Sequence, residues 1–280
     1  MNHRIRRRLV DGVLIGIPLI AMFIFILGPL YWTLSTSLKL ERHIQHRPAF
    51  YWPPEPTFEH FVWSWEAANF AVYFRNSVIV SALSMIFVVI ISVLVSYPLT
   101  RFKFKGKNLT LLAMLGTQFL PTSMMLIPLF LIFIQIGLIN TLTCVIISIV
   151  TFQFPYNTVL MTGFMSGIPV EIEEAAMIDG CSRIQSIIYV VVPILIPGIV
   201  AAGTFAFISA WREFLFTLMF IQRNELLTIS VGLTRMLGEF RTAFGPIAAG
   251  CVIAMIPPIA LFAYIQKFLI TGLSAGAVKG

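Results

Sequence analysis

Charged residues are scarce in this sequence: Asp, Glu, Lys and Arg make up 11% of its 280 residues, whereas 58% are hydrophobic. A soluble domain carries about 25% charged residues. A larger core does not explain the deficit, because a soluble chain of this length must still solvate its outer surface. The low charge excludes an ordinary soluble domain and predicts a surface that contacts lipid.

Cysteine frameworks and nucleotide-binding glycine patterns are also missing. The three cysteines, Cys144, Cys181 and Cys251, are isolated, so they predict neither a disulfide framework nor a metal site. The phosphate loop Gly-x-x-x-x-Gly-Lys-Ser/Thr does not occur, since Gly106-Lys107 is followed by Asn and lacks the earlier glycine. We therefore expect no catalytic residue, no metal site and no cofactor bound by this chain.

Basic residues outnumber acidic ones, giving a net charge of +7, and they are clustered. Four arginines fall in the first eight residues, and a second cluster comprises Arg101, Lys103, Lys105 and Lys107. Such clusters can contact nucleic acid. Beside long apolar segments, however, they follow the positive-inside rule and mark the cytoplasmic side of a membrane. We expect a cytoplasmic N-terminus and no nucleic-acid partner.

Long uncharged runs predict six transmembrane helices, each with the about 20 apolar residues that a helix needs to cross the hydrocarbon. Residues 108–170 lack Asp, Glu, Lys, Arg and His, and such a stretch must fold back, near 137–141. The runs do not alternate, which favours helices over barrel strands. The first is too long for a secretory signal and is expected to remain attached. We expect an all-α protein, 1–280, with one transmembrane domain, cytoplasmic termini and spans at about 12–38, 76–100, 109–136, 141–165, 197–222 and 242–266.

The loop 166–193 predicts a short acidic helix in the cytoplasm. Pro169 suits its first turn, the carboxylates that follow suit the positive end of the helix dipole, and Gly180 suits its end. Ser182 suits the cap of the next helix. Helical spacing places Ile172, Ala175, Ala176 and Asp179 on one face. This small-residue face fits either a groove in a soluble partner or the chain's own membrane domain.

The same loop resembles a known family. Glu174-Ala175-Ala176, three residues, Gly180, nine residues and then Val190-x-Val192-Pro193 look like the EAA loop of ABC importer permeases, which usually ends Ile-x-Leu-Pro. The resemblance implies a coupling helix seated in a cleft of a separate ATPase subunit, with Glu174 as its main polar contact. The docking residues expected on this basis are Glu171, Glu173, Glu174, Ala175, Ala176, Asp179, Gly180 and Pro193.

Other segments are similar to the sugar branch of that family, in particular to second permease subunits of maltose- and oligosaccharide-type importers. They are Arg75-Asn76-Ser77, Trp211-x-Glu213-Phe214 and the tail from Gly272. The resemblance of the tail implies that Gly276, Ala277 and Lys279 contact the ATPase dimer. That dimer would hold the ATP and Mg. The segment 222–244 implies contact with an extracytoplasmic binding protein, and an inert connection is the alternative.

Polar residues within the expected spans are candidates for a translocation path. Arg212 departs from the family, which usually has Asn there, and it lines the path or extends to the outer interface. Gln118, Gln153 and Asn157 can bond sugar hydroxyls, although bonding between helices is the commoner use of such groups. The full candidate set is Trp211, Arg212, Glu213, Gln118, Gln153 and Asn157.

The expected function is solute import by alternating access, in which ATP closes the ATPase dimer and the coupling helix transmits that closure to the spans. The expected protein lies in a bacterial or archaeal cytoplasmic membrane as a transport subunit, not an enzyme. Its expected partners are a second permease subunit, the ATPase dimer, the binding protein, a sugar and lipid. The alternatives are a polyol or glycerol phosphate as substrate, and a secondary transporter or channel without an ATPase.

Overall fold

The structure is a computed structural model that describes the backbone of residues 3–66, 68–239 and 244–277, and the side chains of 12–66, 68–236 and 244–266. Within these residues the chain is helical and contains no strand. It forms two compact units, Met1–Phe70 with Leu233–Met255 and Ala71–Gly232 with Ile256–Gly280. Three helices contain residues of both units: α13 (Ile229–Glu239), α14 (Phe244–Ala277) and α4 (Phe70–Arg101), of which only Phe70 belongs to the first unit.

The first unit contains α1 (His3–Ser37), α2 (Glu41–Ile44), α3 (Glu59–Glu66) and the first part of α14. The most apolar stretch of α1 has no buried residue, so this helix requires lipid or another chain around it. The Glu41 carboxylate accepts the backbone N–H groups of Phe244 (3.0 Å) and Gly245 (3.2 Å), which caps the start of α14. Ser64 Oγ donates to the Pro246 carbonyl at 2.8 Å, so α3 and α14 are tied together.

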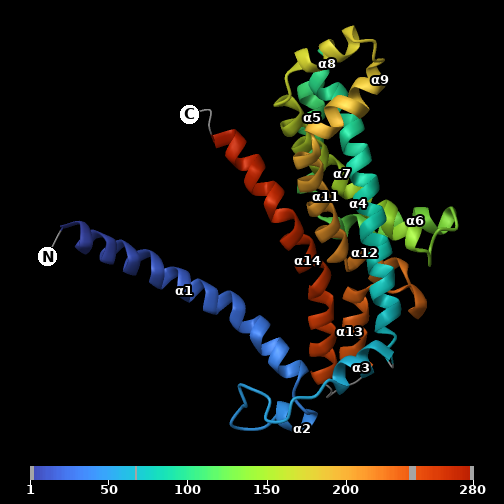
Figure 1. The fold of residues 1–280 in the computed structure, drawn as a ribbon. Coiled ribbons are helices and arrows are strands. Elements are labelled where there is room, and N and C mark those ends of the chain that lie inside the picture. The colour runs from blue at the N-terminus through green and yellow to red at the C-terminus, as the bar shows by residue number, and fades with distance from the viewer. Residues whose placement is uncertain (1–2, 67, 240–243, 278–280) are drawn as a thin grey trace. The chain divides into compact units, whose positions relative to one another are not determined.

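The second unit is built around three long helices, α4, α7 and α11 (Figure 1). Helix α11 packs against α7, and a Cβ added at Gly198 would lie 2.7 Å from the Phe164 ring, so this close approach requires glycine. The remaining helices connect these three or cover them. The bounds are α4 (Phe70–Arg101), α5 (Lys107–Gly116), α6 (Leu126–Gln135), α7 (Leu142–Ser166), α8 (Val170–Ile178), α9 (Arg183–Ser186), α10 (Val192–Ile194), α11 (Ile196–Trp211) and α12 (Leu215–Phe220).

In the part of the chain that the structure describes, four helices are each long and apolar enough to cross a membrane: Gly12–Ser37, Phe70–Arg101, Leu142–Ser166 and Phe244–Gln266. Two broken pairs bring the number to six if each pair is one span. Lys107–Phe119 and Thr122–Gln135 meet at 90°, and Arg183–Ile194 and Ile196–Trp211 meet at 76°. The single transmembrane domain expected from the sequence stays a prediction.

The second broken pair, Arg183–Ile194 with Ile196–Trp211, differs at both ends from the expected fifth span, 197–222. Its first half starts at Arg183, and a π-helical segment, Ile187–Val191, precedes Pro193. Pro193 has no N–H to donate to the carbonyl four residues earlier, which favours such an irregularity. At the other end, α11 stops at Trp211, because the Glu213 carboxylate accepts the N–H groups of Phe216 (2.7 Å) and Thr217 (3.1 Å) and so starts the separate helix α12.

Candidate functional site

The hairpin formed by α8 and α9 is the part of the second unit with the strongest sequence signal, and it lies at one end of α4 (Figure 1). Pro169 is the N-cap residue of α8, one position before the first turn in which the sequence placed it. Gly180 ends the turn with φ of +94°, a left-handed conformation that favours glycine. Ser182 forms a capping box with Gln185, each side chain accepting the other's backbone N–H. The expected end and following cap are confirmed, and the start differs by one residue.

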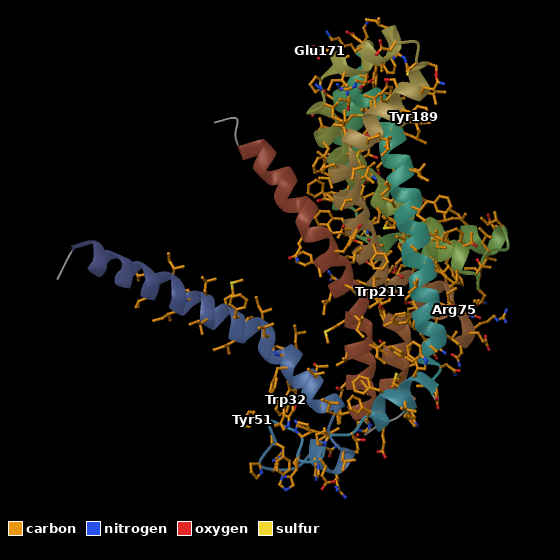
Figure 2. All side chains as sticks on the ribbon, in the orientation of Figure 1. Trp32, Tyr51, Arg75, Glu171, Tyr189 and Trp211 are labelled. Atoms are coloured by element: carbon orange, nitrogen blue, oxygen red, sulfur yellow. The ribbon has the colours of Figure 1, made fainter. Side chains whose placement is uncertain are left out.

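One face of α8 is open to solvent in the isolated chain. It presents Glu171, Ile172, Glu174, Ala175, Ile178 and Asp179, and Figure 2 shows Glu171 at the outer tip of this end. Ile178 is 85% exposed and lies among the acidic side chains of this face. Ala176, predicted on the same face, is half-buried. Sequence periodicity missed Ile178, which lies three residues after Ala175 and extends the open face.

Glu173 lies on the opposite side of α8 from the open face. It is 3% exposed, and its carboxylate forms an ion pair with the Arg101 guanidinium, whose Nε donates to Oε1. Tyr97 Oη donates to the other carboxylate oxygen at 3.0 Å. Arg101 also reaches the Met165 carbonyl with Nη1 at 3.5 Å. The structure therefore directs this predicted docking residue into its own chain, toward α4.

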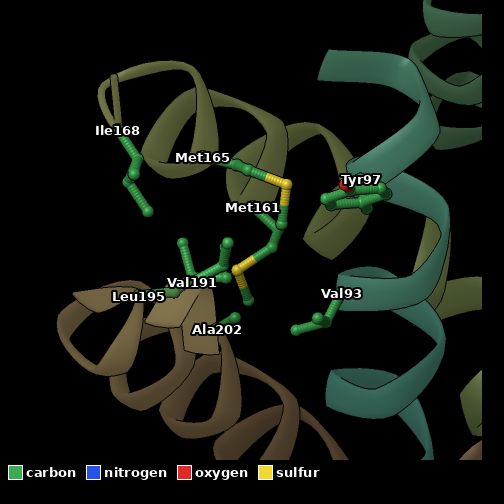
Figure 3. Close-up of a cluster of buried hydrophobic side chains, with 8 residues drawn as sticks. All are labelled: Val93, Tyr97, Met161, Met165, Ile168, Val191, Leu195 and Ala202. Atoms are coloured by element: carbon green, nitrogen blue, oxygen red, sulfur yellow. The ribbon is translucent and has the colours of Figure 1, made fainter. Parts of the chain in front are cut away.

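A cluster of buried apolar side chains lies next to that ion pair (Figure 3). It joins α4, α7 and the segment from η3 (Ile187–Val191) to α11, and Tyr97 belongs both to it and to the ion-pair network. Its members are Val93, Tyr97, Met161, Met165, Ile168, Val191, Leu195 and Ala202. The segments on either side of the hairpin, at Ile168 and Val191, are thus held to the long helices by apolar packing, and α8 itself is held by the ion pair.

A polar groove of about 340 Å³ gathers two of the translocation-path candidates, Gln118 and Gln153. Its aromatic wall includes Tyr156 and Phe205, whose rings meet edge to face with centroids 6.3 Å apart. The lining residues are Thr117, Gln118, Leu120, Thr122, Phe152, Gln153, Tyr156, Phe205 and Ser209. Amides and hydroxyls beside aromatic faces suit a polyhydroxylated ligand, whose rings have apolar faces and whose rims donate and accept hydrogen bonds.

The other path candidates lie elsewhere. Asn157 is fully buried, and its Nδ2 donates to the Gln153 carbonyl at 2.9 Å within α7. Trp211 is buried and stacks on Phe207 with ring centroids 5.7 Å apart, in the middle of the view in Figure 2. Arg212 is exposed, and Glu213 caps α12. None of these four residues lines the polar groove.

The Arg75-Asn76-Ser77 segment, quoted above only for its resemblance, has a structural role in the second unit. Asn76 Nδ2 donates to the carbonyls of Glu225 and Leu227, both at 2.9 Å. Ser77 Oγ accepts the Ile229 N–H at 2.8 Å. These bonds hold the start of the predicted binding-protein segment against the first turns of α4. Of the predicted tail contacts, Gly276 and Ala277 lie in α14 and Lys279 lies outside the described residues.

Comparison with known proteins identifies the family. The model described as "binding-protein-dependent transport system inner membrane component" matches residues 88–274. The chain belongs to this family. The permease protein SmoH of a sulfoquinovosyl glycerol transport system from Agrobacterium fabrum is 35% identical over 254 residues, 91% of this chain and 89% of the relative. The diacetylchitobiose uptake system permease protein DasC of Streptomyces coelicolor is 32% identical over 275 residues, 98% of this chain and 100% of the relative.

A solved structure has the same fold. A chain of a bacterial ABC transporter involved in the import of the acidic polysaccharide alginate superposes with a TM-score of 0.82 at 20% identity, covering 94% of this chain and 97% of that one. Its family and its relatives make the protein a multi-pass membrane protein and a transport permease subunit. The resemblance inferred from the EAA-type loop is confirmed at the level of the family and the fold.

Proposed function

We propose that this permease imports a sugar or an oligosaccharide as one of two permease subunits, driven by an ATPase dimer in the cytoplasm and supplied by an extracytoplasmic binding protein. The observation that carries the proposal is the open face of α8. In this proposal α8 is the coupling helix that docks on the ATPase, which alone binds ATP and Mg.

The composition of this face favours a protein partner over water. Burying a fully exposed isoleucine side chain stabilises a complex by about 1.5–3 kcal/mol, so Ile178 is a candidate for the centre of an interface. Ala175 is small enough to let a partner approach closely. Glu171, Glu174 and Asp179 surround these residues and suit a basic rim on the partner.

The position of the basic cluster supports a cytoplasmic location for this end of the second unit. The Arg183 guanidinium lies 5.3 Å from the centre of the Phe102 ring, which places the segment after α4 beside α9. Lys103 and Lys105 of that segment are exposed. By the positive-inside rule, the α8–α9 hairpin then lies in the cytoplasm, together with both termini of a six-span chain.

The substrate class rests on the relatives and on the polar groove. The relatives named above belong to transport systems for a sulfoquinovosyl glycerol and a diacetylchitobiose. Among solved structures, a bacterial alginate ABC transporter in complex with an alginate pentasaccharide-bound periplasmic protein has a chain with a TM-score of 0.70 at 16% identity. The groove's lining includes no Lys or Arg to pair with a phosphate group, which favours a sugar over glycerol phosphate.

Copurification tests the ATPase proposal. The tagged chain, expressed with the genes of its transport system and extracted in mild detergent, should retain an ATPase subunit. Glu174→Lys and Ile178→Asp should each abolish this retention, because both alter the open face. Glu66→Lys is the control, since it reverses a charge on an exposed residue of α3. Uptake that follows an ion gradient, by a chain that never retains an ATPase, would instead indicate a secondary transporter.

A further inference from the structure

We infer that Glu173, Arg101 and Tyr97 form a buried link through which movement of α8 is transmitted to α4. The inference rests on the proposed docking of α8 to an ATPase, and it assigns the three residues a positioning role. No contact of these side chains with the substrate or the ATPase is implied. The link separates two functions on one short helix: its open face binds, and its buried face transmits.

The link constrains the orientation of the Glu173 carboxylate because each of its two oxygens has its own donor. Oε1 is paired with the Arg101 guanidinium, and Oε2 accepts the Tyr97 hydroxyl at 3.0 Å. Arg101 and Tyr97 lie four residues apart on α4, so they are neighbours on one face of that helix. Two partners on one rigid helix fix both the position and the orientation of the carboxylate.

The link also reaches the end of α7. Arg101 Nη1 lies 3.5 Å from the Met165 carbonyl, one residue before α7 ends at Ser166. Tyr97 meets Phe102 edge to face, and the Phe102 ring in turn lies beneath Arg183 of α9. The pair thus lies where the ends of two long helices meet both helices of the hairpin.

Burial distinguishes this pair from the other ion pairs of the described residues. The side chains of Arg101 and Glu173 are 5% and 4% exposed, whereas those of Arg42 and Glu55 are 66% and 63% exposed. Well-packed apolar residues in place of a buried ion pair are often equally or more stable, so stability alone does not account for such a pair. The neighbouring lysines Lys103 and Lys105 are exposed, so Arg101 does not serve as a simple interfacial cation.

Without the ion pair, apolar packing alone would hold the hairpin less firmly against α4. The buried cluster of Figure 3 connects α4 and α7 to Ile168 and Val191, the residues that flank the hairpin, through non-directional contacts that include the flexible side chains of Met161 and Met165. Such contacts permit sliding, whereas a carboxylate held by two donors does not. We therefore expect α4 and the hairpin to move as one body while the link is intact.

Distance measurements between spin labels test the link in the assembled importer. Labels are placed on Leu94 of α4 and Ile184 of α9, which are 65% and 69% exposed, after the three native cysteines are replaced. In lipid nanodiscs the intact chain should give one narrow distance distribution that is the same without nucleotide and with ATP and vanadate. The double variant Arg101→Met with Glu173→Leu should retain the ATPase, but its distribution should broaden or shift by several Å on addition of nucleotide.

Two further variants sharpen the result. Tyr97→Phe keeps the ion pair and the ring but removes one donor, so a smaller nucleotide-dependent broadening is expected. Arg42→Met with Glu55→Leu, which removes the exposed pair, should leave the distribution unchanged. An unchanged distribution in the Arg101/Glu173 double variant, with the ATPase retained, would overturn the link. Loss of the ATPase from that variant would place the pair in docking and overturn it too. An intact chain that retains no ATPase would refute the proposed function itself.

Discussion

The two ends of α4 are held in different ways. At its first turns, the neutral side chains of Asn76 and Ser77 bond to backbone groups of residues 225–229. At its last turns, Tyr97 and Arg101 hold a charged side chain of α8. Both ends are buried, so each contact must satisfy its polar groups internally.

This difference suggests different mechanical roles. A side chain that donates to backbone carbonyls holds a segment in one position, because a backbone carbonyl cannot move without moving the main chain. A carboxylate held by two donors on one helix instead keeps the two helices together, so that a shift of α8 carries this end of α4 with it. We interpret the Asn76 end as a fixed connection to the segment 225–229 and the Arg101 end as the connection to a moving helix.

The largest expected effect is at the charged end. Glu173→Ala leaves the Arg101 guanidinium buried without its counter-ion, which should destabilise the protein by about 3–5 kcal/mol. The melting temperature of the detergent-solubilised chain measures this. The double variant Arg101→Met with Glu173→Leu should melt near the unaltered protein. A double variant as unstable as Glu173→Ala would show that the pair itself contributes the stability.

The neutral end should show a smaller effect. Asn76→Leu removes both amide bonds and leaves the carbonyls of Glu225 and Leu227 without these donors, at a cost of roughly 1–3 kcal/mol. The same thermal measurement applies, together with limited proteolysis between residues 222 and 229, which should be faster in the variant. Equal losses at Asn76 and Glu173 would contradict the distinction between the two ends.

The sequence predicted the features that depend on local chemistry. Pro169, Gly180 and Ser182 indicated the start, the end and the next cap of the hairpin, because turn and cap preferences act within a few residues. Long apolar runs likewise indicated where most of the long apolar helices lie. The family resemblance then supplied the docking hypothesis, which no local rule contains.

The sequence did not predict which side of α8 faces inward. Glu173 and Glu174 are adjacent residues with the same side chain, and only the position of α4 determines which of the two is buried. Arg101 lies 72 residues away, so its pairing depends on tertiary packing. Similarly, Glu213 was interpreted as a path residue, whereas its carboxylate accepts the N–H groups of Phe216 and Thr217 in the first turn of α12. Phe214 is the N-cap residue of α12, and Glu is not a residue type typical of caps, so no local rule indicated this contact.

The Glu213 cap allows a third test, with an effect smaller than that at Asn76. Glu213→Ala removes an acceptor for the first N–H groups of α12 and should cost about 1 kcal/mol. Glu213→Gln, which keeps an acceptor oxygen, should recover part of the loss. Because the side chain does not line the polar groove, neither variant should change which sugars compete for uptake. A changed order of competing sugars would return Glu213 to the translocation path.

The exposed ion pair of the first unit should show the smallest effect. Arg42 Nη2 lies 2.7 Å from Glu55 Oε2, a shorter contact than several buried hydrogen bonds of the chain, yet both side chains are mostly in water. Solvent and salt screen such a pair, so Arg42→Ala should cost no more than about 1 kcal/mol, and less at high ionic strength. Melting temperatures at low and high salt check this. If Arg42→Ala were as harmful as Glu173→Ala, burial would not be the property that distinguishes the Arg101 end of α4, and the argument for a dedicated link there would lose its physical basis.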